Sequence, residues 1–127
     1  MSLDVYLTRP REMQPDDHQC NCGFCDRNAR TTTDVYWCNT THNHNTIANA
    51  VGVYNACWRP DEIGITKAHQ LIDPLRAGLA FLEAKPEAFK HLEPDNGWGS
   101  VDSFTGFVRA YLRAAEANPD ADVRVSR

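Results

Sequence analysis

A short segment near the N-terminus contains four residues that can bind a soft metal ion. Its ligand-type side chains are His18, Cys20, Cys22 and Cys25, all within eight residues. Thiolates and neutral imidazole suit the tetrahedral coordination of Zn²⁺, and the two-residue gap between Cys22 and Cys25, with Gly23 easing the turn, lets both sulfurs reach one ion. The segment therefore predicts a zinc-clipped loop, with free thiols in a solvated loop as the alternative interpretation.

The fourth ligand of such a site stays open. Cys20 follows a one-residue gap, so the candidates for the fourth position are His18, Cys38, His42 and His44. A zinc ion with four protein ligands has no open position for a substrate, so we expect a structural role for it. Five cysteines are an odd number, and three of them lie too close together for ordinary disulfides, which favours reduced thiols or metal.

Three short stretches have the pattern of β-strands. Residues 3–8 alternate between apolar and polar side chains, residues 35–40 include β-branched and aromatic side chains, and Val123 alternates with Val125 near the end of the sequence. Residues 9–33 contain two prolines, paired acids and the cysteines but little apolar periodicity. We therefore predict a long loop there, joining the first two strands as a hairpin.

Between the second and third strands, apolar residues recur at helical spacing in three stretches. These stretches are residues 47–58, 66–84 and 102–118. Pro60 should end the first helix, and Pro74 should kink or split the second, because proline lacks the N–H of a helical hydrogen bond. Pro86 to Leu92 predict one or two extra turns.

The order β-β-α-α-α-β predicts an α+β domain in which helices cover one face of a small antiparallel sheet of about three strands. The length favours a single domain over 1–127, with 9–33 as a metal-binding or flexible loop insertion. A composition of 42% hydrophobic and 24% charged residues is that of an ordinary globular protein. The C-terminal strand, at a sheet edge, would allow pairing between copies as a homo-oligomer.

The charge pattern limits the classes of partner. A net charge of −4 without a block of Lys or Arg argues against binding to nucleic acid. Five arginines can still converge in space to hold one anion, namely Arg59, Arg109, Arg113, Arg124 and Arg127. No cationic region precedes an apolar run, and no stretch approaches the length of a membrane span, so we expect a cytoplasmic location without membrane contact.

Five segments spread over nearly the whole chain resemble a family of small, functionally uncharacterised proteins of phages and prophages. They are Ser2–Leu7, Thr41–Asn43, Trp58–Gly64, Asn96–Gly99 and Val125–Arg127. The resemblance implies a phage or prophage origin, and hence the cytoplasm of a bacterial host. No chemistry is assigned to these motifs, so the resemblance implies origin and extent more than mechanism.

Two of these motifs suggest a ligand site. The segment Thr41 to Asn45 opens a helix, where unpaired N–H groups favour an anion and the imidazoles of His42 and His44 can donate a hydrogen bond or act as a base. Its candidate ligand-binding residues are His42, Asn43 and His44. Helix capping is the alternative, with Thr41 and Asn43 as capping types. Trp58 beside Arg59 can clamp a planar or anionic ligand, and Trp98 lies in a glycine turn. The alternative is that each tryptophan plugs the edge of a core.

Our first functional hypothesis is a non-enzymatic binding protein with a structural zinc. A phage or prophage would use it to engage a host protein or to sequester a small anionic ligand. The second hypothesis is a small zinc-dependent hydrolase, in which His42 and His44 join cysteine ligands around a zinc that keeps one water. The third is a nucleotide-binding sponge that uses the helix start at Thr41–Asn45 together with Arg59.

Overall fold

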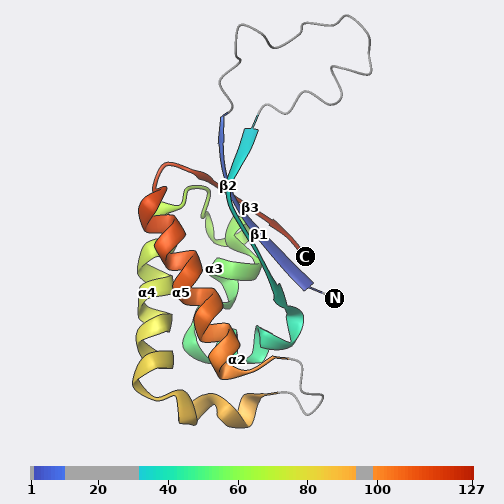
Figure 1. The fold of residues 1–127 in the computed structure, drawn as a ribbon, viewed down its shortest axis with the longest axis vertical. Coiled ribbons are helices and arrows are strands. Elements are labelled where there is room, and N and C mark those ends of the chain that lie inside the picture. Colours follow the sequence, from blue (N-terminus) through green and yellow to red (C-terminus); the bar gives the residue numbers. More distant parts are fainter. Residues whose placement is uncertain (1, 11–31, 94–98) are drawn as a thin grey trace, which may run out of the picture.

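The computed structural model describes residues 2–10, 32–93 and 99–127. Within these ranges the chain forms two layers, a three-stranded antiparallel sheet and a set of helices that covers one of its faces (Figure 1). The predicted α+β class is confirmed. The predicted zinc ligands His18, Cys20, Cys22 and Cys25 lie outside the described residues, as does Trp98.

The sheet has the N-terminal strand in its centre. The strands are β1 (Ser2–Pro10), β2 (Thr32–Thr41) and β3 (Asp122–Ser126), in the spatial order β2-β1-β3, and β1 is antiparallel to both neighbours. Both strands of the hairpin extend further than the sequence predicted, because Arg9 pairs with Thr33 and Pro10 with Thr32. The predicted loop over 9–33 was therefore too long at both ends.

Alternation along the strands divides the sheet into an inner and an outer face. Leu3, Val5 and Leu7 of β1 are fully buried on the inner face. Their partners on β2 are Thr40, Cys38 and Tyr36. Val123 and Val125 of β3 pack against the same core. The apolar alternation seen in the sequence thus corresponds to one buried face.

The helical layer consists of short elements followed by two long helices. In chain order they are η1 (His42–His44), α2 (Asn45–Val51), α3 (Tyr54–Trp58), η2 (Pro60–Ile63), α4 (His69–Ala84), η3 (Pro86–Leu92) and α5 (Val101–Ala117). α4 and α5 pack against each other, and α5 also contacts β2. Among the described helices, none combines the length and the apolar character that crossing a membrane requires.

The first predicted helix, over residues 47–58, is broken in two. Gly52 has φ = 81°, in the left-handed region, and its N–H bonds to the carbonyl oxygens of Ala48 and Asn49. Val53 N–H bonds to Ala48 O at 2.9 Å, so α2 ends in a glycine C-cap. The apolar spacing continues across the break because both short helices bury their apolar side chains in the same core.

The second predicted helix is not split at Pro74. α4 runs without interruption from His69 to Ala84 and begins three residues later than predicted. Pro74 lies in the second turn, where its missing N–H deprives only the carbonyl of Gln70 of a partner. Gln70 is exposed, so water can bond to that carbonyl.

α5 is the helix that the sequence located best. Ser100 is its N-cap: Ser100 Oγ accepts from Ser103 N–H at 3.1 Å, and Ser103 Oγ accepts from Ser100 N–H at 3.0 Å. This reciprocal pair is a capping box, with Ser103 in place of the more usual Glu or Gln. The buried face of α5 contributes Phe104 and Tyr111, both fully buried, to the core.

Candidate functional site

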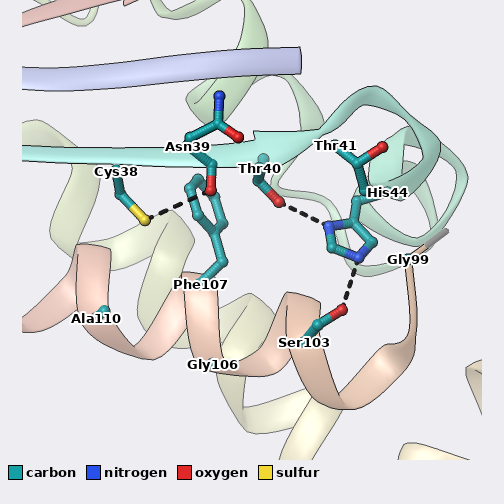
Figure 2. Close-up of a pocket in the computed structure, with 10 residues that line it drawn as sticks. All are labelled: Cys38, Asn39, Thr40, Thr41, His44, Gly99, Ser103, Gly106, Phe107 and Ala110. Carbon is teal, nitrogen blue, oxygen red and sulfur yellow. Dashed lines mark hydrogen bonds between the residues drawn. The ribbon is translucent and has the colours of Figure 1, made fainter. Parts of the chain in front are cut away.

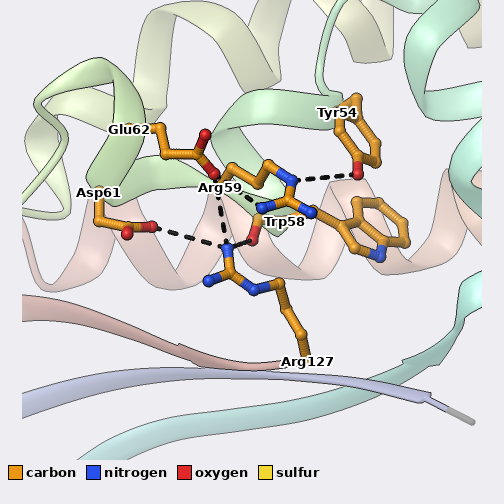
Figure 3. Close-up of polar contacts among 6 residues, drawn as sticks. All are labelled: Tyr54, Trp58, Arg59, Asp61, Glu62 and Arg127. Carbon is orange, nitrogen blue, oxygen red and sulfur yellow. Dashed lines mark hydrogen bonds and ion pairs between the residues drawn. The ribbon is translucent and has the colours of Figure 1, made fainter.

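Three of the segments that carry the resemblance meet at one place, although they are far apart in the sequence. Figure 3 shows two of them, with Arg127 beside the turn that holds Trp58, Arg59 and Glu62. Trp58 Nε1 donates to His42 Nδ1 at 3.1 Å, and Arg127 Nη1 donates to the carbonyl oxygen of Trp58 at 2.9 Å. Arg59 extends from the same turn, with Nη1 at 2.8 Å from Glu62 Oε2. The fold therefore joins the segments Thr41–Asn43, Trp58–Gly64 and Val125–Arg127.

Trp58 belongs to the core and has no free face for a ligand. Only 2% of it is exposed, and its ring stacks on Tyr54 with centroids 5.5 Å apart. A second contact, to Phe104, has centroids 6.4 Å apart. The burial favours the alternative interpretation of Trp58 as a core plug over that of a ligand clamp, because the ring fills space between α3 and α5.

The arginines of this cluster are already paired with carboxylates. Arg127 Nη1 lies 3.8 Å from Asp61 Oδ1 and 3.9 Å from Glu62 Oε2, and Glu62 also binds Arg59. Elsewhere, Arg109 pairs with Glu83 at 3.5 Å. These partly exposed pairs neutralise one another and contribute little stability individually. Of the five arginines that the sequence offered for a basic pocket, four thus lie beside carboxylates: Arg59, Arg109, Arg124 and Arg127.

The helix start at Thr41–Asn45 is used for capping. Thr41 Oγ1 accepts from Asn43 N–H at 3.2 Å and opens the three-residue turn η1. Nδ1 of His42 accepts a hydrogen bond from Trp58 Nε1–H, so in the neutral imidazole the ring's own proton is on Nε2. That Nε2 atom is buried and has no hydrogen-bond partner in the described part of the chain. This segment is therefore a turn fixed by Thr41 and Trp58.

His44 is buried between the sheet and α5 (Figure 2). It is 3% exposed; its Nδ1 lies 2.7 Å from Thr40 Oγ1 and its Nε2 lies 3.0 Å from Ser103 Oγ. Gly99 packs so closely that a Cβ there would lie 2.9 Å from His44 Cδ2. Burial lowers the pKa of His44, and a hydrogen bond with the Ser100 backbone partly opposes the shift. The ring is therefore a neutral bridge between β2 and α5.

The row Thr40, His44 and Ser103 has the order of orienting group, base and hydroxyl, which is the arrangement of a nucleophilic site. The Ser103 hydroxyl is nevertheless occupied, because it accepts from Ser100 N–H and lies 3.0 Å from Ser100 O, to which it can donate. It has a single proton to donate, and the cap uses both of its roles. The row fastens the start of α5 to β2, and its geometry supports a structural role.

The remaining candidates for the fourth zinc ligand are placed as follows. His44 uses both ring nitrogens in hydrogen bonds, and His42 uses Nδ1 to bind Trp58. Cys38 lies on the inner face of β2, with its thiol 3.7 Å from the carbonyl oxygen of Asn39. In residues 2–10, 32–93 and 99–127 no three ligand-type side chains come together as a metal site.

Sequence reasoning missed a surface on the outer face of the sheet. Tyr6 on β1 pairs with Trp37 on β2 and with Arg124 on β3, so the three side chains form a row across the sheet. Trp37 is 58% exposed, and the guanidinium carbon of Arg124 lies 4.2 Å from the centre of the Tyr6 ring. We call these residues the outer row. The alternation that buries Tyr36 and Cys38 would have placed Trp37 on the opposite face.

A groove lies between β2 and α5. It has a volume of about 410 Å³. Its lining comes from the end of β2, from η1, and from the start of α5: Cys38, Asn39, Thr40, Thr41, His44, Gly99, Ser103, Gly106, Phe107 and Ala110 (Figure 2). The groove and the outer row thus both border β2.

Comparisons with protein-family models, curated proteins and solved structures give no match to this chain.

Proposed function

We propose that this chain is a non-enzymatic binding protein that engages a host protein through the outer row Tyr6, Trp37 and Arg124. The observation that supports this most directly is the 58% exposure of Trp37 on a sheet face that no described helix covers. A large aromatic side chain held in water forgoes about 25 cal/mol for each Å² of apolar surface left unburied. A partner that covers this face recovers that free energy.

The composition of the outer row also favours a protein partner. Tyrosine, tryptophan and arginine are the residue types that dominate binding energy in protein interfaces. The row spans all three strands, and its central member Tyr6 lies on the strand that is paired on both sides. The side chains are therefore presented by a rigid surface, which lowers the entropy lost on binding. The resemblance to phage and prophage proteins points to a protein of the bacterial host as the partner.

The alternatives receive less support from the geometry. A zinc hydrolase built on His42 and His44 would need a lone pair on a histidine nitrogen. Both His44 nitrogens are hydrogen-bonded, to Thr40 and Ser103, and the bond from Trp58 to His42 Nδ1 leaves the proton of the neutral ring on Nε2. A nucleotide sponge at Thr41–Asn45 would need free N–H groups and unpaired arginines, whereas Thr41 caps the turn and Arg59 binds Glu62.

Structural zinc in the segment His18–Cys25 is part of the proposal and rests on the residue pattern alone. The native mass of the purified protein is expected to exceed the denatured mass by one zinc ion, and the excess should disappear with a chelator. A variant with both Cys22→Ser and Cys25→Ser should lack the excess, whereas Cys57→Ser, in a fully buried thiol remote from that segment in sequence, should keep it. Equal native and denatured masses for the unmodified protein would refute the zinc clip.

The partner proposal is tested by capture from a lysate of the bacterium that carries the gene, followed by binding measurements with the purified partner. Trp37→Ala is expected to weaken binding at least about thirtyfold, the loss typical of a central aromatic contact. Phe81→Ala is the matched control, because Phe81 is 60% exposed but lies on α4, away from the sheet. Its affinity should stay within about twofold of the unmodified protein, as expected for a contact outside the interface.

Two results would refute the proposal. One is that no protein is captured in a Trp37-dependent manner. The other is that Trp37→Ala and Phe81→Ala change the affinity for the purified partner equally, which would show that exposed aromatic side chains contribute in a non-specific way.

A further inference from the structure

α5 runs along β2 in matched steps. Tyr111 stacks on Tyr36 with ring centroids 5.9 Å apart, and Ser103 binds His44 just beyond the end of β2. Phe107, one helical turn from each, lines the groove together with Cys38. Four helical residues rise about 6 Å and two strand residues about 6.7 Å. Every fourth residue on this face of α5 therefore lies level with every second residue of β2.

The adjacent face of α5 extends beyond the edge of β2, and few atoms of the described residues cover it. Gly106 and Ala110 line the groove there. A Cβ placed on Gly106 would meet no atom within 4 Å, so the space over this part of the helix is open. This face of α5 thus forms the floor of an open space beside β2, and no fourth strand of the described chain fills that space.

The edge of β2 that borders this floor is unpaired in the described sheet, because β2 pairs only with β1. Alternate residues of an edge strand direct their N–H and C=O groups away from the sheet. Figure 2 shows the carbonyl oxygen of Asn39 on the groove side, where its contact is the Cys38 thiol at 3.7 Å. A thiol is a weak donor, so this carbonyl is available to a stronger one.

We infer that the partner docks as an extended strand that adds to the free edge of β2 and lies over Gly106 and Ala110 of α5. This inference rests on the proposed function, and it names the part of the partner that is recognised. One occupant accounts for both surfaces: side chains on one side of the added strand enter the groove, and those on the other side become cross-strand neighbours of Trp37. Main-chain hydrogen bonds to β2 give affinity, and the groove selects small or medium apolar side chains.

The experiment uses the full chain, purified with any metal it holds, and a displayed library of random peptides as the probe. Selected peptides are synthesised, and their affinities are measured for the unmodified protein, for Gly106→Leu and for Ala117→Leu. Gly106→Leu fills the groove and is expected to reduce affinity more than about tenfold, the loss of a well-packed contact. Removing a helix-interior glycine raises helix propensity, so this variant should melt no lower than the unmodified protein. Ala117→Leu, on an exposed position of α5 outside the groove, should leave affinity unchanged.

A second readout tests strand addition itself. Methylating the peptide's amide nitrogens one at a time should weaken binding at every second position, because only alternate N–H groups of an added strand face β2. An insensitive scan, a pattern of three to four residues, or a library that yields no Gly106-dependent peptide would overturn the inference. A dimer of this chain that dissociates with Gly106→Leu would also overturn it, because a second copy would then occupy the edge.

The two proposals fail separately. If the captured partner depends on Trp37 but not on Gly106, the proposed function stands and the added strand is wrong. If capture depends on neither residue, both proposals are wrong.

Discussion

Trp58→Ala is expected to lower the free energy of unfolding by about 3–5 kcal/mol, the range for truncating a buried aromatic side chain. The ring is 2% exposed and packs on Tyr54 and Phe104, so its removal leaves a cavity between α3 and α5. The hydrogen bond from Nε1 to His42 is lost as well, which leaves His42 Nδ1 without its donor. Urea denaturation followed by circular dichroism measures the change.

Trp37→Ala is the internal control for this result, because it removes the same side chain from an exposed position. Its effect on unfolding should stay within about 0.5 kcal/mol, as for other surface substitutions. Comparable destabilisation by both substitutions would show that Trp37 is also buried in the folded protein, and that would refute the outer row as an open surface.

His44→Ala is expected to lower the free energy of unfolding by about 2–4 kcal/mol, because it leaves a cavity and two hydroxyl groups without their partner. The groups concerned are Thr40 Oγ1 and Ser103 Oγ, at 2.7 and 3.0 Å from the ring. Ser103 keeps its bonds to Ser100, so α5 retains its cap. The predicted damage is therefore loss of the His44 bridge between Thr40 on β2 and Ser103 on α5.

The same histidine gives stability a defined pH dependence. Burial lowers the pKa of His44 below its ordinary value of 6.5, so the unfolded chain binds more protons than the folded chain between the two pKa values. Stability should therefore fall as the pH drops below about 6.5, with a slope of up to about 1.4 kcal/mol per pH unit. His44→Ala should remove this slope. Replacing the exposed His69 or His91 by Gln should keep the slope. If either replacement removed it, the assignment of the effect to His44 would be wrong.

The fold could be predicted in outline because two of its signals are local. The alternation of Leu3, Val5 and Leu7 marked a half-buried strand, and the apolar stripe of α5 marked a helix with one buried face. Strand order could not be predicted, because nothing in the residues of β3 states which edge it joins. The break at Gly52 was missed because apolar spacing continues through it, whereas the left-handed conformation depends on one glycine.

The candidate site was less accessible to sequence reasoning. Residue type correctly identified Thr41 as a capping residue, but it could not show that His44 turns inward to meet Ser103 on a distant helix. Trp58 and Trp37 are the same amino acid, each next to a cysteine in the sequence, and the tertiary packing makes one a core residue and the other a surface residue. The outer row takes one residue from each of three strands that are separated in the sequence, so a pattern of neighbouring residues cannot reveal it.

The central position of β1 also governs the order in which the chain can fold. Its two edges need partners at very different distances along the chain: Asp4 pairs with Asn39 on one side and with Ser126 on the other. Closing the longer loop costs more chain entropy, and this entropy is lost before any hydrogen bond between β1 and β3 has formed. Completion of the sheet is therefore a non-local step, and until it occurs one edge of the most apolar strand is open to pairing with other chains. Slow refolding and aggregation at high protein concentration are the kinetic consequences of this topology.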